Sequence, residues 1–262
     1  MIANAAREAF SAAIDARRIE EAGLNALQTQ RQLFFDGWLL RLSPGSAKRA
    51  RSVNAHFGSS LPTDAKVDRC ETLYASAGLP TLFRITPFST PADLDAVLDR
   101  RGYVAFDHTL VQLVTLPRSP LATPVASELE AVRAAAFVDA VAALRGSSRL
   151  ERDAHLERLA NTPLVTRAVV VRSEDRVVAC GQLALDQGLA GVYDMVTAAA
   201  SRGRGLATAI VADLLDRGAK CGATHAFLQV NEDNAAARAV YRKFGFATVY
   251  AYHYRARPSE CR

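Results

Sequence analysis

Two segments of the chain repeat the same pattern 143 residues apart, and this repeat limits the folds that the chain can adopt. AVLDRRGY at 96–103 aligns with AVYRKFGF at 239–246. Upstream of each lie a short apolar strand pattern, LFRI or FLQV, and a helical pattern that ends at Gly78 or Gly222. Both copies have the order strand, helix, strand, helix, strand over some 60 residues, which predicts a tandem repeat.

The chain of 262 residues is half hydrophobic, which is enough for two cores. The pattern predicts an α/β (α+β) fold with two mixed-sheet domains, 1–120 and 121–262, each a twisted central sheet flanked by helices. The segment PRSPLATP at 117–124 is the expected linker. In the first domain we expect strands at 32–42, near 51–55, 81–85 and 103–116, and helices at 64–77 and 91–102. In the second we expect helices at 126–144, 149–160, 205–221 and 234–245, with strands at 164–172, 176–185, 189–197, 225–230 and 246–257.

Net charge and cysteine spacing indicate which partners and which cellular compartment to expect. The formal net charge is +5 without a basic arm, so an anionic small molecule suits the chain as well as a nucleic acid would. Four cysteines form no CxxC pair, and no apolar run reaches the length of a membrane span. The first 23 residues suggest an amphipathic helix and no targeting peptide. We expect a cytoplasmic protein with reduced thiols, no metal, and no nucleic-acid or membrane partner. An oligomer is possible, but the sequence does not indicate one.

The loop SRGRGLATAI at 201–210 predicts an anion site. It follows a strand and opens a helix, whose first amides lack intrahelical partners and carry the positive end of the dipole. Its glycines let the backbone approach a ligand, and its two arginines add charge. A diphosphate would fit, although Arg and Gly are also common in ordinary surface turns. The loop is neither a Walker motif nor the GxGxxG fingerprint.

The residues around this loop resemble the GNAT superfamily of acetyl-CoA-dependent N-acetyltransferases. Arg202-x-x-Gly205-x-Ala207 matches the family's Arg/Gln-x-x-Gly-x-Gly/Ala signature, and Asn234-x-x-Ala237-x-x-x-Tyr241 with a later Gly-Phe matches its second motif. The resemblance is strong over about 165–255 and reaches 30–116 only through the repeat. It implies two GNAT-like domains in tandem, acetyl-CoA as co-substrate, and a small-molecule or peptide amine as acceptor.

The resemblance also implies which residues contact coenzyme A. The loop would hold the pyrophosphate, and the backbone before it would pair with the pantetheine arm between two splayed strands. The residues implied are Val196, Thr197, Arg202, Gly203, Arg204, Gly205, Leu206, Ala207, Asn234 and Tyr241.

Acetyl transfer needs a base for the amine and a proton donor for the leaving thiolate. Tyr241 matches the family's general acid, although it could also serve only in packing. Asp194, in the strand before the loop, is the best-placed carboxylate for a base, directly or through water, but could equally be a solvent-facing strand residue. Glu232 and Asp233 follow the next strand, and Asp233 could equally start a helix. His225 and His253 have no second histidine or other partner at a functional spacing and are interpreted as ordinary strand residues.

The first copy lacks these parts. GSSLPT at 58–63 stands where the loop should be, Asp64 would repel a phosphate, and Pro91 and Leu98 replace Asn234 and Tyr241. We therefore expect a degenerate copy that packs on the second and helps to shape its acceptor pocket. The basic residues Lys48, Arg49 and Arg51 are interpreted as a solvated turn. The alternative to an N-acetyltransferase is a catalytically silent acyl-CoA-binding regulator or scaffold.

Overall fold

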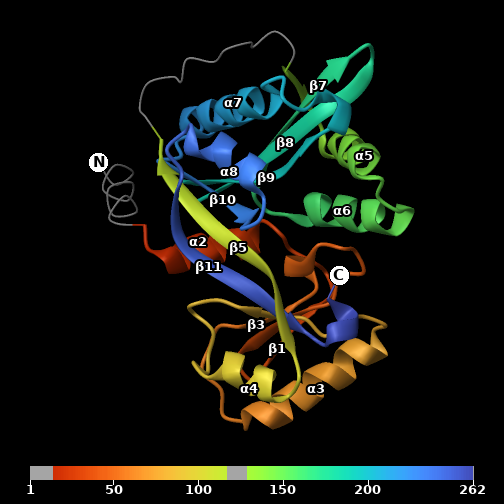
Figure 1. The fold of residues 1–262 in the computed structure, drawn as a ribbon, viewed down its shortest axis with the longest axis vertical. Coiled ribbons are helices and arrows are strands. Elements are labelled where there is room, and N and C mark those ends of the chain that lie inside the picture. The colour runs from red at the N-terminus through yellow and green to blue at the C-terminus, as the bar shows by residue number, and fades with distance from the viewer. Residues whose placement is uncertain (1–13, 117–128, 262) are drawn as a thin grey trace.

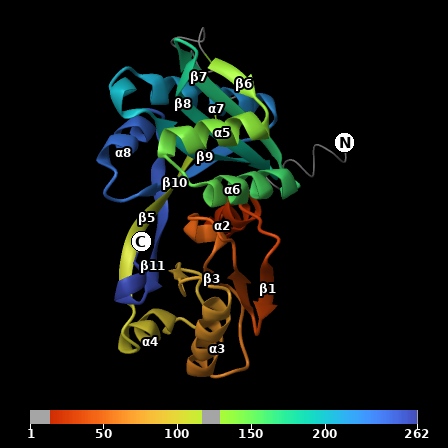
Figure 2. The same cartoon turned by 90° about the vertical axis from the view of Figure 1, so that its right-hand side faces the viewer.

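The computed structural model describes residues 14–116 and 129–261. Its strands form one sheet of eleven, in the order β1-β2-β3-β4-β11-β5-β10-β9-β8-β7-β6 (Figures 1 and 2). The strands are β1 (Gln32–Phe35), β2 (Trp38–Arg41), β3 (Val53–Ala55), β4 (Phe83–Ile85), β5 (Val104–Thr115), β6 (Leu129–Val132), β7 (Val165–Ser173), β8 (Arg176–Asp186), β9 (Leu189–Thr197), β10 (His225–Asn231) and β11 (Ala247–Ala256).

Helices cover both ends of this sheet. In Figure 1, α3 and α4 lie at one end, α2 lies near the middle, and α5 to α8 lie at the other end. The α-helices are α2 (Ala16–Asn25), α3 (Thr63–Ser76), α4 (Leu94–Arg100), α5 (Ala134–Arg145), α6 (Arg149–Asn161), α7 (Leu206–Lys220) and α8 (Ala235–Arg242). Short 3-10 helices are η1 (Lys48–Ala50), η3 (Ala199–Ser201) and η4 (Pro258–Glu260).

The repeated element order is present in the structure. The series β3-α3-β4-α4-β5 in the first half matches β9-α7-β10-α8-β11 in the second. Helix α3 begins at Thr63 and α7 at Leu206, and β5 begins at Val104 and β11 at Ala247, which are offsets of 143 residues. In each half the two strands joined by the longer helix are parallel.

The two halves exchange their last strands. Strand β5 lies between β10 and β11, and β11 lies between β4 and β5. Each half therefore has the other's final strand next to its own central strands. Strands β5 and β11 run side by side from the middle of the molecule toward the end that carries α3 and α4 (Figure 1). The expected pair of central sheets is thus replaced by a single sheet, because these two long strands pair with each other.

A buried ion pair ties α2 to the exchanged strands. Arg84 of β4 donates to both carboxylate oxygens of Glu20, and the Tyr250 hydroxyl of β11 donates to the same carboxylate at 2.7 Å. Burial opposes ionisation of Glu20, but the charge and hydrogen bonds of Arg84 hold its pKa below the usual value. Because losing one partner would leave a buried charge unpaired, this contact fixes α2 against the seam of the two halves.

Two segments differ from the sequence expectation. The single strand expected at 32–42 is a hairpin, turned at Asp36 and Gly37, which both have positive φ. An Asp-Gly pair favours this tight turn. The helix expected at 126–144 is shorter than predicted. Its first described residues, 129–132, form β6, which pairs with β7 at the sheet edge, and α5 begins only at Ala134. The expected linker at 117–124 lies outside the described residues.

Candidate functional site

Strands β9 and β10 separate where the site is found. They pair in parallel only from Leu189 to Val192 and from His225 to Leu228, although both strands continue. On the other side, β9 carries one extra residue against β8, since Cys180 opposes Val196 and Gln182 opposes Tyr193. This bulge and the separation leave an opening in the sheet beside residues 193–197.

A groove of about 590 Å³ occupies one side of this opening, between the end of β9 and the first turns of α7 and α8. All of the residues implied as coenzyme A contacts line it except Arg204, which is exposed. The groove is also lined by residues outside that set: Met195, Ser201, Thr208, Ala236, Ala237, Val240 and Lys243. Ser201, Thr208 and Ala237 belong to the predicted loop and motif, whereas sequence reasoning missed the other four. Lys243 is the C-cap of α8, two positions after the matched Tyr241, so its place beside the groove could have been noticed.

The loop before α7 leaves open space in front of the first amides of the helix. Gly203 and Gly205 have φ of 76° and 79°, and a Cβ added at either would meet no atom within 4 Å. Gly205 is the N-cap of α7 and provides no side chain to its first amides. These amides and the positive end of the helix dipole therefore face open space at the mouth of the groove, as a diphosphate requires.

Tyr241 lines the same groove from α8. Its ring packs edge-on against Phe246, with centroids 5.9 Å apart, and no described residue accepts its hydroxyl proton. Burial raises its pKa to about 12, so the phenol is protonated at neutral pH. Asn234 accepts a hydrogen bond from the amide of Ala237 at 3.0 Å and thereby caps α8.

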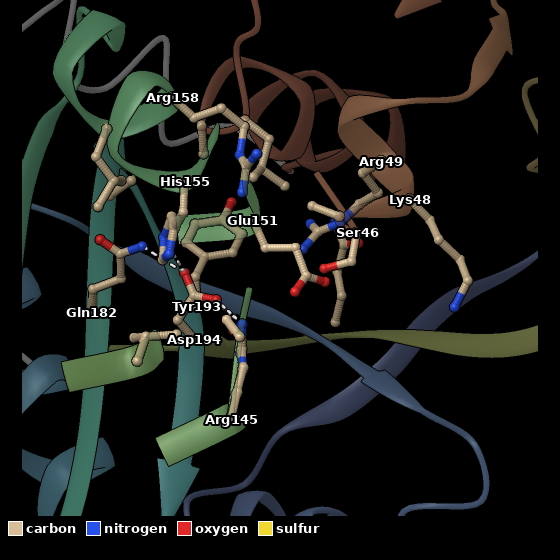
Figure 3. Close-up of a pocket in the computed structure, with 18 of the residues that line it drawn as sticks. Ser46, Lys48, Arg49, Arg145, Glu151, His155, Arg158, Gln182, Tyr193 and Asp194 are labelled. Carbon is tan, nitrogen blue, oxygen red and sulfur yellow. Dashed lines mark hydrogen bonds and ion pairs between the residues drawn. The ribbon is translucent and has the colours of Figure 1, made fainter. Parts of the chain in front are cut away.

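A second cavity, of about 350 Å³, lies on the other side of the opening, between the two halves of the chain (Figure 3). Its walls come from η1 and β5 in the first half, and from α5, α6 and strands β8 to β11 in the second. Cys180 of β8 packs with α5, whereas a Cβ on the next residue, Gly181, would meet Ile210 and Leu214 of α7. The groove and the cavity therefore lie on opposite faces of the sheet.

Asp194 lies in the bulge of β9 and lines this cavity. Its backbone φ is 51°. Its carboxylate contacts Arg145 at 3.0 Å and His155 at 3.3 Å, and it accepts a hydrogen bond from Gln182 at 2.8 Å (Figure 3). Burial acts to raise the pKa of Asp194, but the hydrogen bond and charge of His155, with Arg145 and Gln182, hold it well below its usual value.

This geometry changes what Asp194 can do. A carboxylate that is stabilised as an anion by Arg145 and by hydrogen bonds from His155 and Gln182 is a weak proton acceptor. His155, which sequence reasoning missed, is buried in the cavity wall and held by that carboxylate. Its helix, α6, has charged residues throughout and no clear apolar stripe, so the sequence carried little sign that this histidine would be buried.

The remaining candidates are elsewhere. Glu232 and Asp233 line neither the groove nor the cavity. His225 contacts the Thr224 hydroxyl and His253 contacts Asp95, as expected of ordinary strand residues. The basic turn is partly different from the expectation of a solvated turn, because Lys48 and Arg49 line the cavity.

A comparison with protein families matches residues 135–246 to the model of the Acetyltransferase (GNAT) family. These residues are thus similar to a GNAT acetyltransferase domain, which supports an acyltransferase enzyme. The match contains the groove, Tyr241, Asp194 and His155.

Similar proteins extend over nearly the whole chain. An uncharacterized N-acetyltransferase of Bacillus subtilis, YobR, is 28% identical over 246 residues, which are 92% of this chain and 98% of that protein. The structure of a GCN5-related N-acetyltransferase from Kribbella flavida has a TM-score of 0.68 at 19% identity and covers 94% of this chain and 97% of its own. A tandem GNAT protein from the clavulanic acid biosynthesis pathway has a TM-score of 0.55 at 15% identity, with 78% and 74% covered.

Two kinds of feature are absent from residues 14–116 and 129–261. No helix there is both long and apolar enough to cross a bilayer. No group of three or more His, Cys, Asp or Glu side chains there could hold a metal ion.

Proposed function

We propose that this protein transfers an acetyl group from acetyl-CoA to a primary amine, with one active site in its C-terminal half. The observation that carries the proposal is a pair of spaces on opposite faces of one opening in the sheet, with Asp194 of β9 in the wall of one and Met195 and Val196 in the wall of the other. Acetyl-CoA would occupy the groove and the amine the cavity, so that both substrates meet at the opening. Such a ternary complex allows direct attack without an acyl-enzyme.

The loop residues fit the diphosphate. Unpartnered amides, two left-handed glycines and open space in front of them support this position for the pyrophosphate, with Lys243 at the mouth as an added charge. The backbone of Val196 and Thr197, beyond the last paired residues of β9 and β10, would pair with the pantetheine arm.

We assign the proton transfers to two side chains. His155 would take the proton that the amine loses, and Asp194 would hold the ring by accepting from Nε2, which leaves Nδ1 as the acceptor. As the amine nitrogen bonds to the acetyl carbon and the carbon–sulfur bond breaks, the Tyr241 hydroxyl would give its proton to the departing thiolate. Asp194 is thus proposed as a positioning residue for the base.

The N-terminal half is proposed to be a GNAT-like copy that has lost its cofactor site and now forms one wall of the acceptor cavity. The matching element order, the 143-residue offset and the likeness to a tandem GNAT protein support this. We accordingly expect one acetyl-CoA per chain and a cytoplasmic enzyme that acts without metal.

Two measurements test this function. Calorimetry should give one acetyl-CoA per chain, and a thiol-release assay with a panel of amines should give turnover above hydrolysis. His155→Gln should lower kcat by about 100-fold or more, as expected of a lost general base, with little change in acetyl-CoA affinity. Binding without turnover for any amine would instead favour the silent acyl-CoA-binding protein, and a stoichiometry of two would contradict the degenerate copy.

A further inference from the structure

The charges that line the cavity are not balanced. Five cationic side chains and three carboxylates face it. Three of the cations have carboxylate partners: Lys48 contacts Asp107 at 3.0 Å, Arg145 contacts Asp194 at 3.0 Å, and Arg152 contacts Asp139 and Asp153. Within the described residues, the other two, Arg49 and Arg158, contact no carboxylate.

Arg158 is the more deeply buried of the two, with 6% of its surface exposed. It donates one hydrogen bond, to the Ser43 hydroxyl at 3.3 Å, and its Nε has no partner. Burial, together with the nearby charges of Arg49 and Arg145, lowers its pKa in spite of Asp194. A buried guanidinium without an anion is costly, because nothing offsets its lost hydration.

Arg49 reaches the same cavity from η1 in the first half. Its guanidinium carbon lies 5.6 Å from the centre of the Tyr193 ring, and its buried Nη1 has no hydrogen-bond partner. Two further residues of the cavity lining have unpartnered buried groups, the Tyr193 hydroxyl and Nε2 of Gln229. Only 8% of the surface of Tyr193 is exposed. Figure 3 shows Arg158, Tyr193 and His155 converging on the cavity from α6 and β9.

Buried donors with nothing to donate to indicate that a ligand supplies the acceptor. We propose that the amine substrate carries an anionic oxygen group, a carboxylate or a phosphate, which Arg49 and Arg158 bind together. This inference rests on the proposed function and adds the class of acceptor. The first half of the chain then has a defined part in recognition, since it supplies one of the two arginines.

Matched pairs of amines test this directly. Amino acids are compared with their amides, and phosphoethanolamine with ethanolamine, by kcat/KM in the thiol-release assay. A charge-assisted contact adds about 1.5–3 kcal/mol, so the anionic member of a preferred pair should be favoured by about 10- to 100-fold. Preference in only one kind of pair distinguishes carboxylate from phosphate. Equal use of the neutral members would overturn the inference while leaving the transferase intact.

Variants connect the preference to these side chains. Arg49→Gln should bring the anionic-to-neutral ratio within about twofold of one, and Arg49→Lys should keep part of it. The control is Arg172→Gln. Arg172 is an exposed residue of β7 that pairs with Glu130 of β6, so its loss should leave the ratio unchanged. Arg158→Gln should act as Arg49→Gln does, provided that its thermal unfolding shows a folded protein. A ratio that survives Arg49→Gln would contradict the assignment.

A direct binding measurement separates this inference from the proposed function. Calorimetry of the same amine pairs with the protein and coenzyme A needs no turnover. Tighter binding of the anionic member, lost in Arg49→Gln, would support the anion site even if no amine were acetylated. Equal binding of both members would reject it even if acetyl-CoA bound normally.

Discussion

The loops before α3 and α7 occupy matching positions in the two halves, but the backbone amides of the two loops differ in whether they have an acceptor. Before α3, the amides of Ser60 and Leu61 donate to the carboxylate of Asp36 at 2.9–3.1 Å. Before α7, no side chain caps the helix and two glycines leave open space. One loop has an anion from its own chain, and the other is free to bind one from solution.

The surroundings of the two loops follow the same division. In the first half, Lys66 reaches the Asp36 carboxylate at 3.3 Å, and Asp64 in the first turn of α3 is paired with Arg101. Leu98, which aligns with Tyr241, is fully buried in the core of that half. Where the second half has a polar residue that faces a groove, the first half has an apolar residue in a core.

The largest expected effect comes from giving the second loop an anion of its own. Gly205→Asp places a carboxylate at the N-cap of α7, in the space meant for a diphosphate, and should weaken acetyl-CoA binding by roughly 100-fold or more, equal to about 2.8 kcal/mol. The protein should still fold, since the position is exposed and Asp tolerates left-handed φ better than most residues. Calorimetry measures the affinity.

Ser59→Asp is the matched control for this variant. It adds the same charge to the exposed loop of the first half and should leave acetyl-CoA affinity within about twofold. If Gly205→Asp bound acetyl-CoA as the parent does, the loop before α7 would not be the diphosphate site, and the difference between the two loops would have no functional meaning.

A smaller effect is expected from Tyr241→Phe, which moves the second half one step toward the first. The ring remains packed on Phe246, so acetyl-CoA affinity should change little. Loss of the proton donor should lower kcat by about 10- to 100-fold, at or below the low end for general acids, because water can partly replace a phenol beside the thiolate. Steady-state kinetics with an accepted amine measures this.

Tyr103→Phe provides the comparison from the first half. Its hydroxyl donates to Glu71 at 2.7 Å, far from the groove, so its loss should leave kcat unchanged. A Tyr241→Phe enzyme within about twofold of the parent in kcat would reduce Tyr241 to a packing residue and leave the reaction without an assigned acid.

Local pattern predicted much of this molecule. Helical spacing and turn residues indicated α3, α7 and α8, and the motif spacing brought Gly205, Asn234 and Tyr241 together at one groove. Whether each of these residues contacts coenzyme A stays a prediction. The same alternation of strand residues could not reveal the exchange of β5 and β11, because both strands fit either half and their pairing depends on contacts distant in sequence.

The cavity was hidden for the same reason. Lys48 and Arg49 have the composition of a surface turn, and His155 lies on a highly charged helix. Their place at the cavity follows from the packing of the first half against α6, where Gly45 approaches Arg158 closely enough that a Cβ would lie 3.4 Å from its Nη1. Contacts between halves leave no periodic signal in the sequence, so sequence reasoning missed the histidine and did not place Lys48 and Arg49 at a cavity.

The smallest expected effect is a loss of stability when the Asp36 carboxylate, the anion of the first loop, is removed. Hydrogen bonds from the amides of Ser60 and Leu61 lower the pKa of Asp36 below its usual value. A carboxylate with a depressed folded pKa stabilises the protein above its unfolded pKa of about 4, and this contribution is lost as the pH falls. Asp36→Asn should therefore be less stable than the parent at pH 7, and the difference should shrink between about pH 5 and pH 2.

Denaturant unfolding across that pH range measures the difference in stability. Asp216→Asn is the comparison, because this carboxylate lies on α7, contacts the exposed Lys220 and is not part of the first loop. Acetyl-CoA affinity should not change, because Asp36 belongs to the half without the groove. A gap between parent and Asp36→Asn that stayed constant with pH would show that the ionised carboxylate is not what closes this loop, and the contrast with the open loop before α7 would then need another cause.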